Sequence, residues 1–368
     1  MTWEPGRLDD QAHLSEGDPG GMLPAVASSA AHIRTGHRAA VEARLDRLAA
    51  HGRPRAIVVA GMGGSGIAGD ILAAVAGNGV PLPIVTLRSY QLPGWVGATD
   101  LVIAVSGSGD TEETLSVATQ AVRRGSTLLG VGPSGSPLEA IAVQGSAVYV
   151  AVPVDGQSRA NVWLLTIPLI VAAAELRLVP AEADLFERVA KALEDMAHRC
   201  RPSSESFINP GKSLAMDLAE SVPMIWGSSQ VAAVAAYRLA CQLNTNAKYP
   251  AVYGELPEAG HNQVAALDGP MAAHDIFADT AGLTLRLVVM RDVEEHPQVT
   301  RRREAVLRLA RERDVRVTEL TAEGVHPLER IASLIALGDY ASTYLALGYG
   351  VDPTPVSAIT ELKARISQ

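Results

Sequence analysis

The sequence predicts an α/β protein built from doubly wound parallel sheets, and three observations support this fold class. Short apolar segments alternate with helical ones along most of the chain, as in parallel sheets that helices cover on both faces. Glycine- or serine-rich turns follow several of the apolar segments. The pattern begins again in the second half of the chain, so two domains of the same kind are expected.

The composition is that of a globular protein with a large core. The chain has 368 residues, of which 48% are hydrophobic, and this is enough for two ordinary domains. A net charge of -9 argues against non-specific binding to nucleic acid or to an anionic membrane. The longest apolar run, 162–176, contains a proline and is shorter than the roughly 18 residues that a membrane-spanning helix needs. Cys200 and Cys241 give neither a metal-ligand spacing nor a disulfide framework, so a cytoplasmic location is expected.

The first domain is predicted over residues 23–198. Residues 1–22 are rich in Asp, Gly and Pro and are expected to form an irregular N-terminal arm. Two helical stretches come next, at 23–33 and 37–51. Strands are then predicted at 57–60, 82–87, 101–105, 127–131 and 147–152, with helices ending near residue 76 and spanning 112–123 and 161–175.

The second domain is predicted over residues 213–368, with helices at its C-terminal end. A charged helix at 182–198 leads to a polar linker at 199–212. Strands follow at 223–226, 283–290 and 315–318, and helices at 231–243, 298–312 and 328–347. This smaller version of the first half favours an internal duplication.

The stretch 56–70, AIVVAGMGGSGIAGD, predicts an anion site, because a buried strand passes through a glycine turn into a helix. Gly61, Gly63 and Gly66 match the G-x-G-x-x-G pattern of dinucleotide-binding proteins. The second strand is followed by Arg88 where an acidic residue would hold a ribose, so an NADP-binding oxidoreductase stays open as a weaker alternative. A phosphate-binding P-loop is excluded because no Gly-Lys-Ser/Thr follows. The glycines could also serve only close packing of the helix on the strand.

A second loop, SGSGDTEETL, follows the predicted strand 101–105 and contributes three hydroxyls within six residues, those of Ser106, Ser108 and Thr111. Asp110 and Glu113 have the spacing of a helix capping box, but capping alone would not need so many hydroxyls. Backbone amides together with neutral hydroxyls allow an acidic protein to bind a phosphate monoester.

These motifs resemble a known family. GMGGSGIAGD, followed about 40 residues later by SGSGDTEETL, resembles the two signatures of the sugar isomerase (SIS) domain. The later stretches QSRANVWLL, QLNTNAKYPAVYGELPEAGHNQV and SLIALGDYASTYLALGYGVDPTPVSAITELK resemble the bifunctional phosphoglucose/phosphomannose isomerases. The resemblance extends over residues 20–368 and implies two flavodoxin-like SIS domains, a homodimer, an active site at the domain and subunit boundary, and no cofactor or metal.

The resemblance also implies a set of site residues. The first loop faces the sugar in the family, and its residues here are Gly63, Gly64 and Ser65. Ser106, Ser108 and Thr111 match the hydroxyls that hold the phosphate.

Three further positions match the family's catalytic groups. Arg159 matches an arginine that stabilises the enediolate intermediate, His261 a histidine that opens the sugar ring, and Lys363 a lysine near the ring oxygen. Without the resemblance, each of these would be interpreted as an ordinary solvated side chain.

The position of the family's catalytic base departs from the pattern. The family has a glutamate in an N-E-N-A-K stretch, and here the stretch is NTNAK, with Thr245 at that position. An alkyl hydroxyl cannot accept a carbon-bound proton near neutral pH, and loss of general-base catalysis typically costs about 10²- to 10⁴-fold in rate. Glu255, Glu258 and His261 itself are the candidate replacements.

Two functions therefore lead, and the NADP-binding oxidoreductase is the third and weaker hypothesis. One is an isomerase that interconverts glucose 6-phosphate or mannose 6-phosphate with fructose 6-phosphate by proton transfer through an enediol. The other is a sugar-phosphate sensor or partner protein that keeps the phosphate loops and has lost the base.

Overall fold

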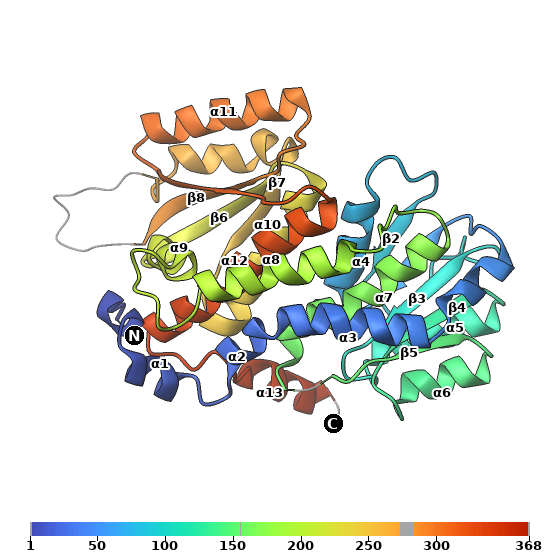
Figure 1. The fold of residues 1–368 in the computed structure, drawn as a ribbon. Helices are drawn as coiled ribbons and strands as arrows, with labels where there is room; N and C mark the ends of the chain where they lie inside the picture. The colour runs from blue at the N-terminus through green and yellow to red at the C-terminus, as the bar shows by residue number, and fades with distance from the viewer. Residues whose placement is uncertain (1, 155, 273–282, 367–368) are drawn as a thin grey trace. The chain divides into compact units, whose positions relative to one another are not determined.

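The computed structural model describes residues 2–154, 156–272 and 283–366 and divides into two compact units (Figure 1). Unit 1 comprises Met1–Val26, Asp195–Val325 and Arg330–Gln368. Unit 2 comprises Ala27–Glu194 and His326–Glu329. Each unit contains one parallel sheet, which confirms the predicted α/β fold class with two doubly wound sheets.

Unit 2 contains a five-stranded sheet in the order β2-β1-β3-β4-β5, in which every neighbouring pair is parallel. Its strands are β1 Ile57–Ala60, β2 Ile84–Leu87, β3 Leu101–Val105, β4 Thr127–Gly132 and β5 Val148–Ala151. Its helices are α3 Ser29–Glu42, α4 Gly64–Ala76, α5 Glu112–Arg123, α6 Pro137–Gln144 and α7 Val162–Glu175, with 3-10 helices η2 Leu45–His51 and η3 Ser158–Ala160.

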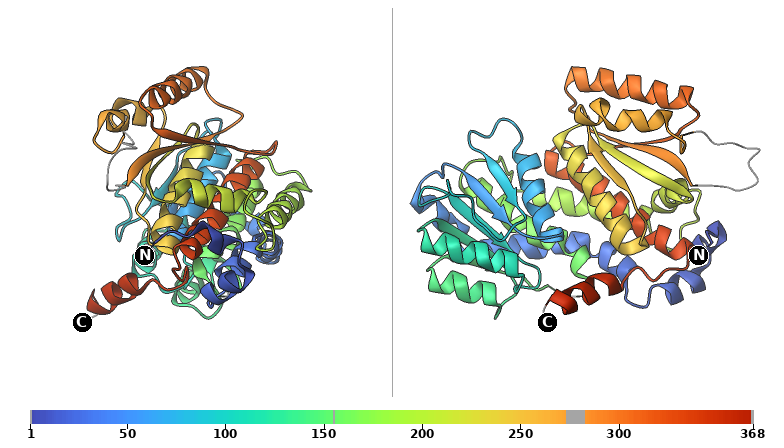
Figure 2. Two further views of the ribbon diagram at one scale, coloured as in Figure 1. Left: turned by 90° about the vertical axis from the view of Figure 1, so that its left-hand side faces the viewer. Right: turned by 180° about the vertical axis from the view of Figure 1, so that it is seen from behind.

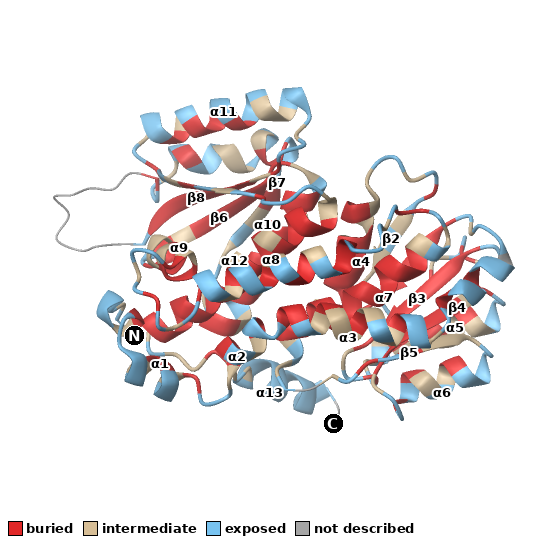
Figure 3. Ribbon diagram, viewed as in Figure 1, coloured by how far each residue is buried: buried red, intermediate tan, exposed pale blue. Residues whose placement is uncertain are grey.

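Helices cover both faces of the unit 2 sheet, which is why β1 and β3 are apolar and buried along their whole length. Helices α5 and α6 pack on one face, and α3, α4 and α7 lie on the other (Figure 1). Buried residues accordingly run along the strands and the inner sides of these helices (Figure 3). The predicted strands and helices of this region are confirmed to within a few residues, but the prediction missed α6. Its signal was the Ser136-Pro137 start, where the Ser136 hydroxyl accepts the Glu139 N–H at 3.2 Å.

Unit 1 contains a four-stranded parallel sheet in the order β7-β6-β8-β9. Its strands are β6 Ser221–Gly227, β7 Val252–Glu255, β8 Thr284–Arg291 and β9 Arg316–Thr321. Its helices are η1 Pro5–Leu8, α1 Gln11–Gly17, α2 Met22–Ala27, α9 Pro210–Leu218, α10 Gln230–Gln242, η4 Leu243–Ala247, η5 Glu258–His261, η6 Gln263–Asp268, α11 Pro297–Glu312 and α13 Ser357–Ile366. Most of α2 belongs to this unit, and α8 Leu185–Arg199 and α12 Pro327–Gly348 contribute residues to both units.

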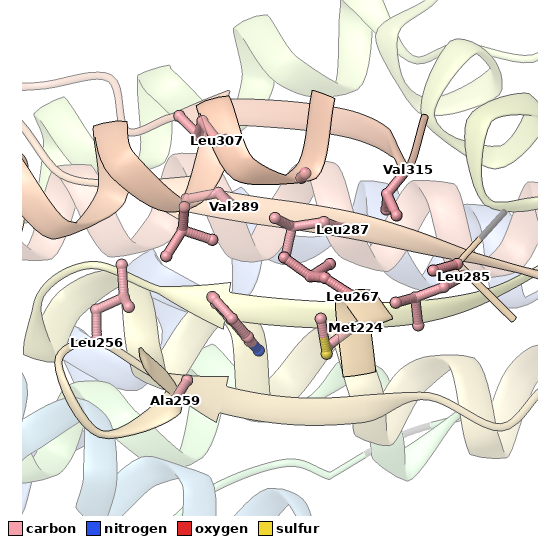
Figure 4. Close-up of a cluster of buried hydrophobic side chains, with 13 residues drawn as sticks. Met224, Leu256, Ala259, Leu267, Leu285, Leu287, Val289, Leu307 and Val315 are labelled. Atoms are coloured by element: carbon pink, nitrogen blue, oxygen red, sulfur yellow. The ribbon is translucent and has the colours of Figure 1, made fainter. Parts of the chain in front are cut away.

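One face of the unit 1 sheet is closed by a compact apolar cluster (Figure 4). Strand residues such as Met224 and Leu287 pack there against Leu267 of η6 and Leu307 of α11. Helix α10 lies on the other side of the sheet from α11 (Figure 2). The prediction missed the short edge strand β7, because only four residues of it join the sheet.

The N-terminal segment is ordered, so the prediction of an irregular arm at 1–22 was wrong there. The Asp10 carboxylate caps α1 by accepting the N–H groups of Ala12 and His13 at 2.9 and 3.1 Å. Leu8 and Leu14 are buried and anchor the short helices. The segment belongs to unit 1, whereas the prediction placed the two domains one after the other along the chain.

Two helix boundaries also differ from the prediction. Helix α3 is continuous across the expected break near residue 35 and ends at Glu42, because Arg44 adopts a left-handed conformation with φ of 57°. The predicted linker at 199–212 includes the start of α9, where Asn209 accepts the Lys212 N–H at 3.1 Å as an N-cap.

The apolar run at 162–176 forms the buried helix α7. Among the described residues, α12 is long and apolar enough to cross a membrane by length and composition alone, and 94% of its apolar window is buried inside the protein.

Candidate active site

The carboxyl ends of β1 and β3 form the topological switch point of the unit 2 sheet. These strands are neighbours, with Ala60 paired with Ala104. After β1 the chain continues to β2 on one side of the pair, and after β3 it continues to β4 on the other side. Ligands of open α/β sheets bind in the crevice at such a point. The turn after β1 with the first residues of α4, residues 61–66, and the loop after β3, residues 106–111, are therefore brought to one edge. We call them the glycine loop and the hydroxyl loop.

The glycine loop needs its glycines for a tight turn and also keeps an open face. A Cβ added to Gly61 would lie 2.8 Å from the carbonyl oxygen of Ser65, and one added to Gly66 would lie 2.8 Å from the carbonyl oxygen of Gly61. Gly63 has φ of +53°, a conformation that disfavours other residues. For Gly63 and Gly64 no described atom would lie within 4 Å of an added Cβ. Close packing and an exposed backbone are thus both present.

Ser65 joins the two loops. Its hydroxyl accepts the backbone N–H of Gly107 at 3.2 Å, and the residue is 9% exposed. The contact fixes the spacing of the glycine loop and the hydroxyl loop.

The hydroxyl loop gathers three side-chain oxygens at the N-terminus of α5. The Oγ of Ser106 lies 2.9 Å from Thr111 Oγ1 and 3.4 Å from Ser108 Oγ, and the last two atoms are 3.4 Å apart. Ser106 is fully buried and its Oγ accepts the Gly109 N–H at 2.9 Å. The Ser108 hydroxyl donates to the Asp110 carboxylate. An anion at this helix end would meet hydroxyl donors and the positive end of the helix dipole.

The capping alternative is not what the structure shows. Thr111, and not Asp110, is the N-cap residue of α5, and within the described part of the chain its side chain makes no capping hydrogen bond. The Thr111 hydroxyl instead bonds within the hydroxyl cluster. The alternative in which Asp110 and Glu113 form a capping box therefore does not apply, since Asp110 is not the N-cap residue.

Gly109→Ala is expected to lower the free energy of unfolding by about 2–4 kcal/mol, because two penalties add. Gly109 has φ of +75°, and an added Cβ would lie 2.3 Å from Ser136 Cβ. Gly135→Ala is the matched control, since Gly135 has φ of +74° and no described atom within 4 Å of an added Cβ, so it should lose only about 1–2 kcal/mol. Urea unfolding followed by circular dichroism measures both, and equal losses would contradict the steric part.

Arg88, the residue that could accommodate an NADP phosphate, is paired with another side chain. Its guanidinium pairs with Asp70 on α4. It also lies against the helix, since a Cβ on Gly66 would be 2.9 Å from Arg88 Nε. The hypothesis of a dinucleotide-binding protein is therefore supported only by the glycine pattern of the sequence.

Tyr90 lies near this edge and was not singled out from the sequence. Its carbonyl oxygen accepts from Ser116 Oγ at 2.9 Å and from Gln120 Nε2 at 2.8 Å, both on α5. A hydrogen bond to Glu113, in the first turn of α5, raises the pKa of Tyr90. The only signal in the sequence was its position just after the second strand.

Arg159 belongs to η3, directly before α7. On the second turn of α7, Leu165 lies against the hydroxyl loop, since a Cβ on Gly107 would be 3.5 Å from Leu165 Cδ1. Asn161, at the N-cap of α7, is buried. The start of α7 thus lies beside the hydroxyl loop, with Arg159 partly exposed one turn earlier.

Thr245 lies in η4, a π-helical turn that continues α10, and such turns are frequent at functional sites. Its hydroxyl donates to the carbonyl oxygen of Cys241 at 2.8 Å. The turn is held firmly, because Asn246 Nδ2 donates to Ser342 Oγ at 3.1 Å and Lys248 Nζ to the Asp352 carbonyl oxygen at 2.8 Å. Position 245 is half-exposed, and these hydrogen bonds fix the backbone on which it lies.

Glu255, Glu258 and His261 follow one another at the carboxyl end of β7 and are all exposed. The Tyr253 hydroxyl lies 3.4 Å from Glu255 Oε2, and Asn262 Nδ2 donates to Glu258 Oε1 at 2.8 Å. Two carboxylates are therefore close in the chain to the candidate ring-opening histidine.

Within the described part of unit 1, Thr245 and His261 lie at opposite ends of the sheet. Helix α10 starts at the carboxyl end of β6 and returns toward the amino end, where Thr245 follows it. There the Tyr249 hydroxyl accepts the N–H of Ser221, the first residue of β6, at 2.9 Å. His261 comes after β7 has crossed back. This unit by itself does not bring the two positions together.

Lys363 lies on α13, and none of the described residues of this helix is buried. Ile359 and Leu362 are 44% and 58% exposed. Among the described residues, no group of three or more His, Cys, Asp and Glu side chains could hold a metal ion.

Comparison with known proteins defines the class first. Tagatose-6-phosphate ketose/aldose isomerase from Escherichia coli superposes with a TM-score of 0.64 at 14% identity, over 91% of this chain and 93% of that one. The model of the bacterial phospho-glucose isomerase C-terminal SIS domain matches residues 207–366. The fold is thus that of SIS phosphosugar isomerases.

Sequence similarity then identifies the family. The bifunctional phosphoglucose/phosphomannose isomerase of Caldicellulosiruptor bescii is 32% identical over 312 residues, which cover 85% of this chain and 89% of the relative. The protein of the same name from Aquifex aeolicus is 29% identical, over 85% of this chain and 91% of the relative. The chain belongs to the bifunctional phosphoglucose/phosphomannose isomerase family, as the resemblance predicted.

Proposed function

We propose that this protein is an aldose–ketose isomerase that interconverts glucose 6-phosphate or mannose 6-phosphate with fructose 6-phosphate. The observation that carries the proposal is the cluster of three hydroxyls at the switch point of unit 2, in a chain of this family. Proton transfer through an enediol needs a site that holds the phosphate, a base, and groups that stabilise the negative oxygen.

In this proposal the hydroxyls of Ser106, Ser108 and Thr111 donate to the phosphate oxygens at the N-terminus of α5. Ser108 then exchanges its bond to Asp110 for one to the phosphate. The open backbone of Gly63 and Gly64 and the neighbouring Ser65 line the sugar side.

The remaining roles follow the family pattern. His261 transfers the proton that opens the ring, Lys363 acts near the ring oxygen, and the Arg159 guanidinium stabilises the enediolate. All three are partly or largely exposed in the structure, so a substrate can reach them.

In this chain another residue must act as the base, because the Thr245 hydroxyl cannot accept a carbon-bound proton near neutral pH. Glu255 and Glu258 are the carboxylates that accompany His261. We propose that one of them accepts the proton from C1 or C2 and returns it, at a lower rate than a glutamate at position 245 would.

A homodimer is part of the proposal. Because Thr245 and His261 lie at opposite ends of the unit 1 sheet, one unit cannot contribute both positions to a single sugar. A second copy of the chain is the simplest way to bring His261, with its neighbours Glu255 and Glu258, to a site that also contains position 245.

The second candidate is a sugar-phosphate sensor or partner protein. Thr245 favours it, because the hydroxyl cluster proposed to bind the phosphate is present, while position 245 has no carboxylate to act as the base. Both an enzyme and a sensor would bind the sugar phosphate, but only an enzyme would convert it.

The test gives purified protein fructose 6-phosphate and follows glucose 6-phosphate and mannose 6-phosphate by coupled assays. We expect turnover by the native protein that falls about 10²- to 10⁴-fold in Glu255→Gln or in Glu258→Gln. Glu304→Gln, an exposed carboxylate on α11, is the control. Thermal stabilisation by fructose 6-phosphate without any turnover would replace the isomerase by the sensor.

A further inference from the structure

The carboxyl end of the unit 1 sheet repeats the switch point of unit 2 but carries different side chains. Strands β6 and β8 are neighbours, as β1 and β3 are in unit 2. Ser228 and Ser229 follow β6 and precede α10. Asp292 and Glu295 follow β8 and precede α11. Carboxylates thus stand where unit 2 has its hydroxyl loop.

Glu295 is completely engaged at this point. Its carboxylate accepts the Ser228 hydroxyl, and Arg303 Nε lies 3.1 Å from each of its two oxygens. Thr300 Oγ1 donates to Glu295 Oε2 at 3.1 Å. The Glu295 and Arg303 side chains are each 6% exposed.

Asp292 is engaged in the same way. The Ser229 hydroxyl donates to Asp292 Oδ2 at 3.1 Å, and Arg330 Nε lies 2.8 Å from Asp292 Oδ1. The Asp292 and Arg330 side chains are 3% and 2% exposed. The buried carboxylates of Asp292 and Glu295 are thus each paired with a buried guanidinium. The same guanidinium groups also contact a second carboxylate each, Arg330 that of Glu294 at 2.7 Å and Arg303 that of Glu319 at 3.6 Å.

We propose that Asp292 and Glu295 permanently occupy the anion position of the unit 1 switch point, so that this unit takes no sugar phosphate and each chain holds one. This inference rests on the proposed function for the identification of the unit 2 loop as the one phosphate site. A phosphate dianion in unit 1 would lie beside two buried carboxylates, and the two arginines that could neutralise it are already paired.

The test has two arms. In the first, calorimetric titration of the native protein with fructose 6-phosphate should give one bound molecule per chain. In the second, Glu295→Ala removes the carboxylate that the buried Arg303 Nε and the Ser228 hydroxyl contact, while Arg303 Nη1 stays 3.6 Å from Glu319 Oε2, so an added anion meets one side of the guanidinium and the hydroxyl. Inorganic phosphate is added at roughly ten times its dissociation constant for the variant. It should raise the Tm of the variant by about 2–6 °C more than it raises the Tm of the native protein.

Glu304→Ala is the matched control, because it removes the same charge from the exposed side of α11 and should show no additional gain with phosphate. If Glu295→Ala does not fold, Glu295→Gln keeps the side-chain volume and should show a smaller gain that still exceeds the control.

Two bound fructose 6-phosphate molecules per native chain, or equal phosphate gains in the Glu295 and Glu304 variants, would overturn the inference. Failure of the proposed function has another signature: the native protein binds no fructose 6-phosphate, while inorganic phosphate still stabilises the Glu295 variant.

Discussion

Replacing Thr245 by glutamate is expected to raise the rate of fructose 6-phosphate isomerisation by about 10²-fold or more, toward the low end of what general-base catalysis contributes. The substitution supplies a carboxylate at the position where the family carries its base. The surrounding turn is already held by the Asn246 and Lys248 hydrogen bonds, so the new side chain would start from a fixed backbone.

The structural cost of this change is small. Thr245 is half-exposed, and among the described residues its hydroxyl bonds to carbonyl oxygens of the preceding turn. Glutamate has a better helix propensity than threonine by a few tenths of a kcal/mol. Lost activity through unfolding is therefore not expected.

Thr245→Gln is the control, because glutamine has the length of glutamate and no basic carboxylate. Steady-state kcat and KM measured for both variants separate the effects: a base raises kcat, whereas a better fit of the sugar lowers KM. An equal gain in the two variants, or none in Thr245→Glu, would contradict the assignment of position 245 to the base.

Ser106→Ala is expected to weaken fructose 6-phosphate binding by about 10- to 150-fold, the equivalent of one lost hydrogen bond to a charged group. Ser106 is the buried centre of the hydroxyl cluster, and it contacts Thr111 Oγ1 and the Gly109 N–H. Removing its oxygen leaves that N–H without this acceptor, so the free energy of unfolding should also fall by about 1–3 kcal/mol.

Thr119→Ala is the matched control, since its hydroxyl bonds to the Leu115 carbonyl oxygen within α5 at 2.8 Å and lies two turns from the loop. Isothermal titration of both variants with fructose 6-phosphate gives the dissociation constants. If Ser106→Ala binds as tightly as Thr119→Ala, the hydroxyl loop does not hold the phosphate.

Local patterns in the sequence were sufficient for the sheet of unit 2. The segments 57–60 and 101–105 are apolar throughout and are followed by turns and helices of regular period, so their burial and parallel pairing could be predicted. The short helix α6 and the edge strand β7 were missed, because eight and four residues carry too little periodicity.

The positions of the glycine loop and the hydroxyl loop were also predictable, because each lies within a few consecutive residues and follows a strand. Their joining by Ser65 and Gly107 was not, since this contact links residues 42 positions apart. The ion pairs of Arg88 with Asp70 and of Asp292 with Arg330 could not be predicted either, because each joins residues from two different elements.

The sequence alone therefore determined the fold class, the positions of the glycine loop and the hydroxyl loop, and the threonine at position 245, because each of these depends on short consecutive stretches. The tertiary structure decided how the polar side chains at the carboxyl edge of each sheet are paired. In unit 2 the hydroxyls of Ser106, Ser108 and Thr111 gather at the edge, next to the exposed Asp110 carboxylate, whereas in unit 1 Arg303 and Arg330 pair with the buried carboxylates of Glu295 and Asp292. Such pairings depend on how strands and helices distant in sequence pack, and no local pattern encodes them.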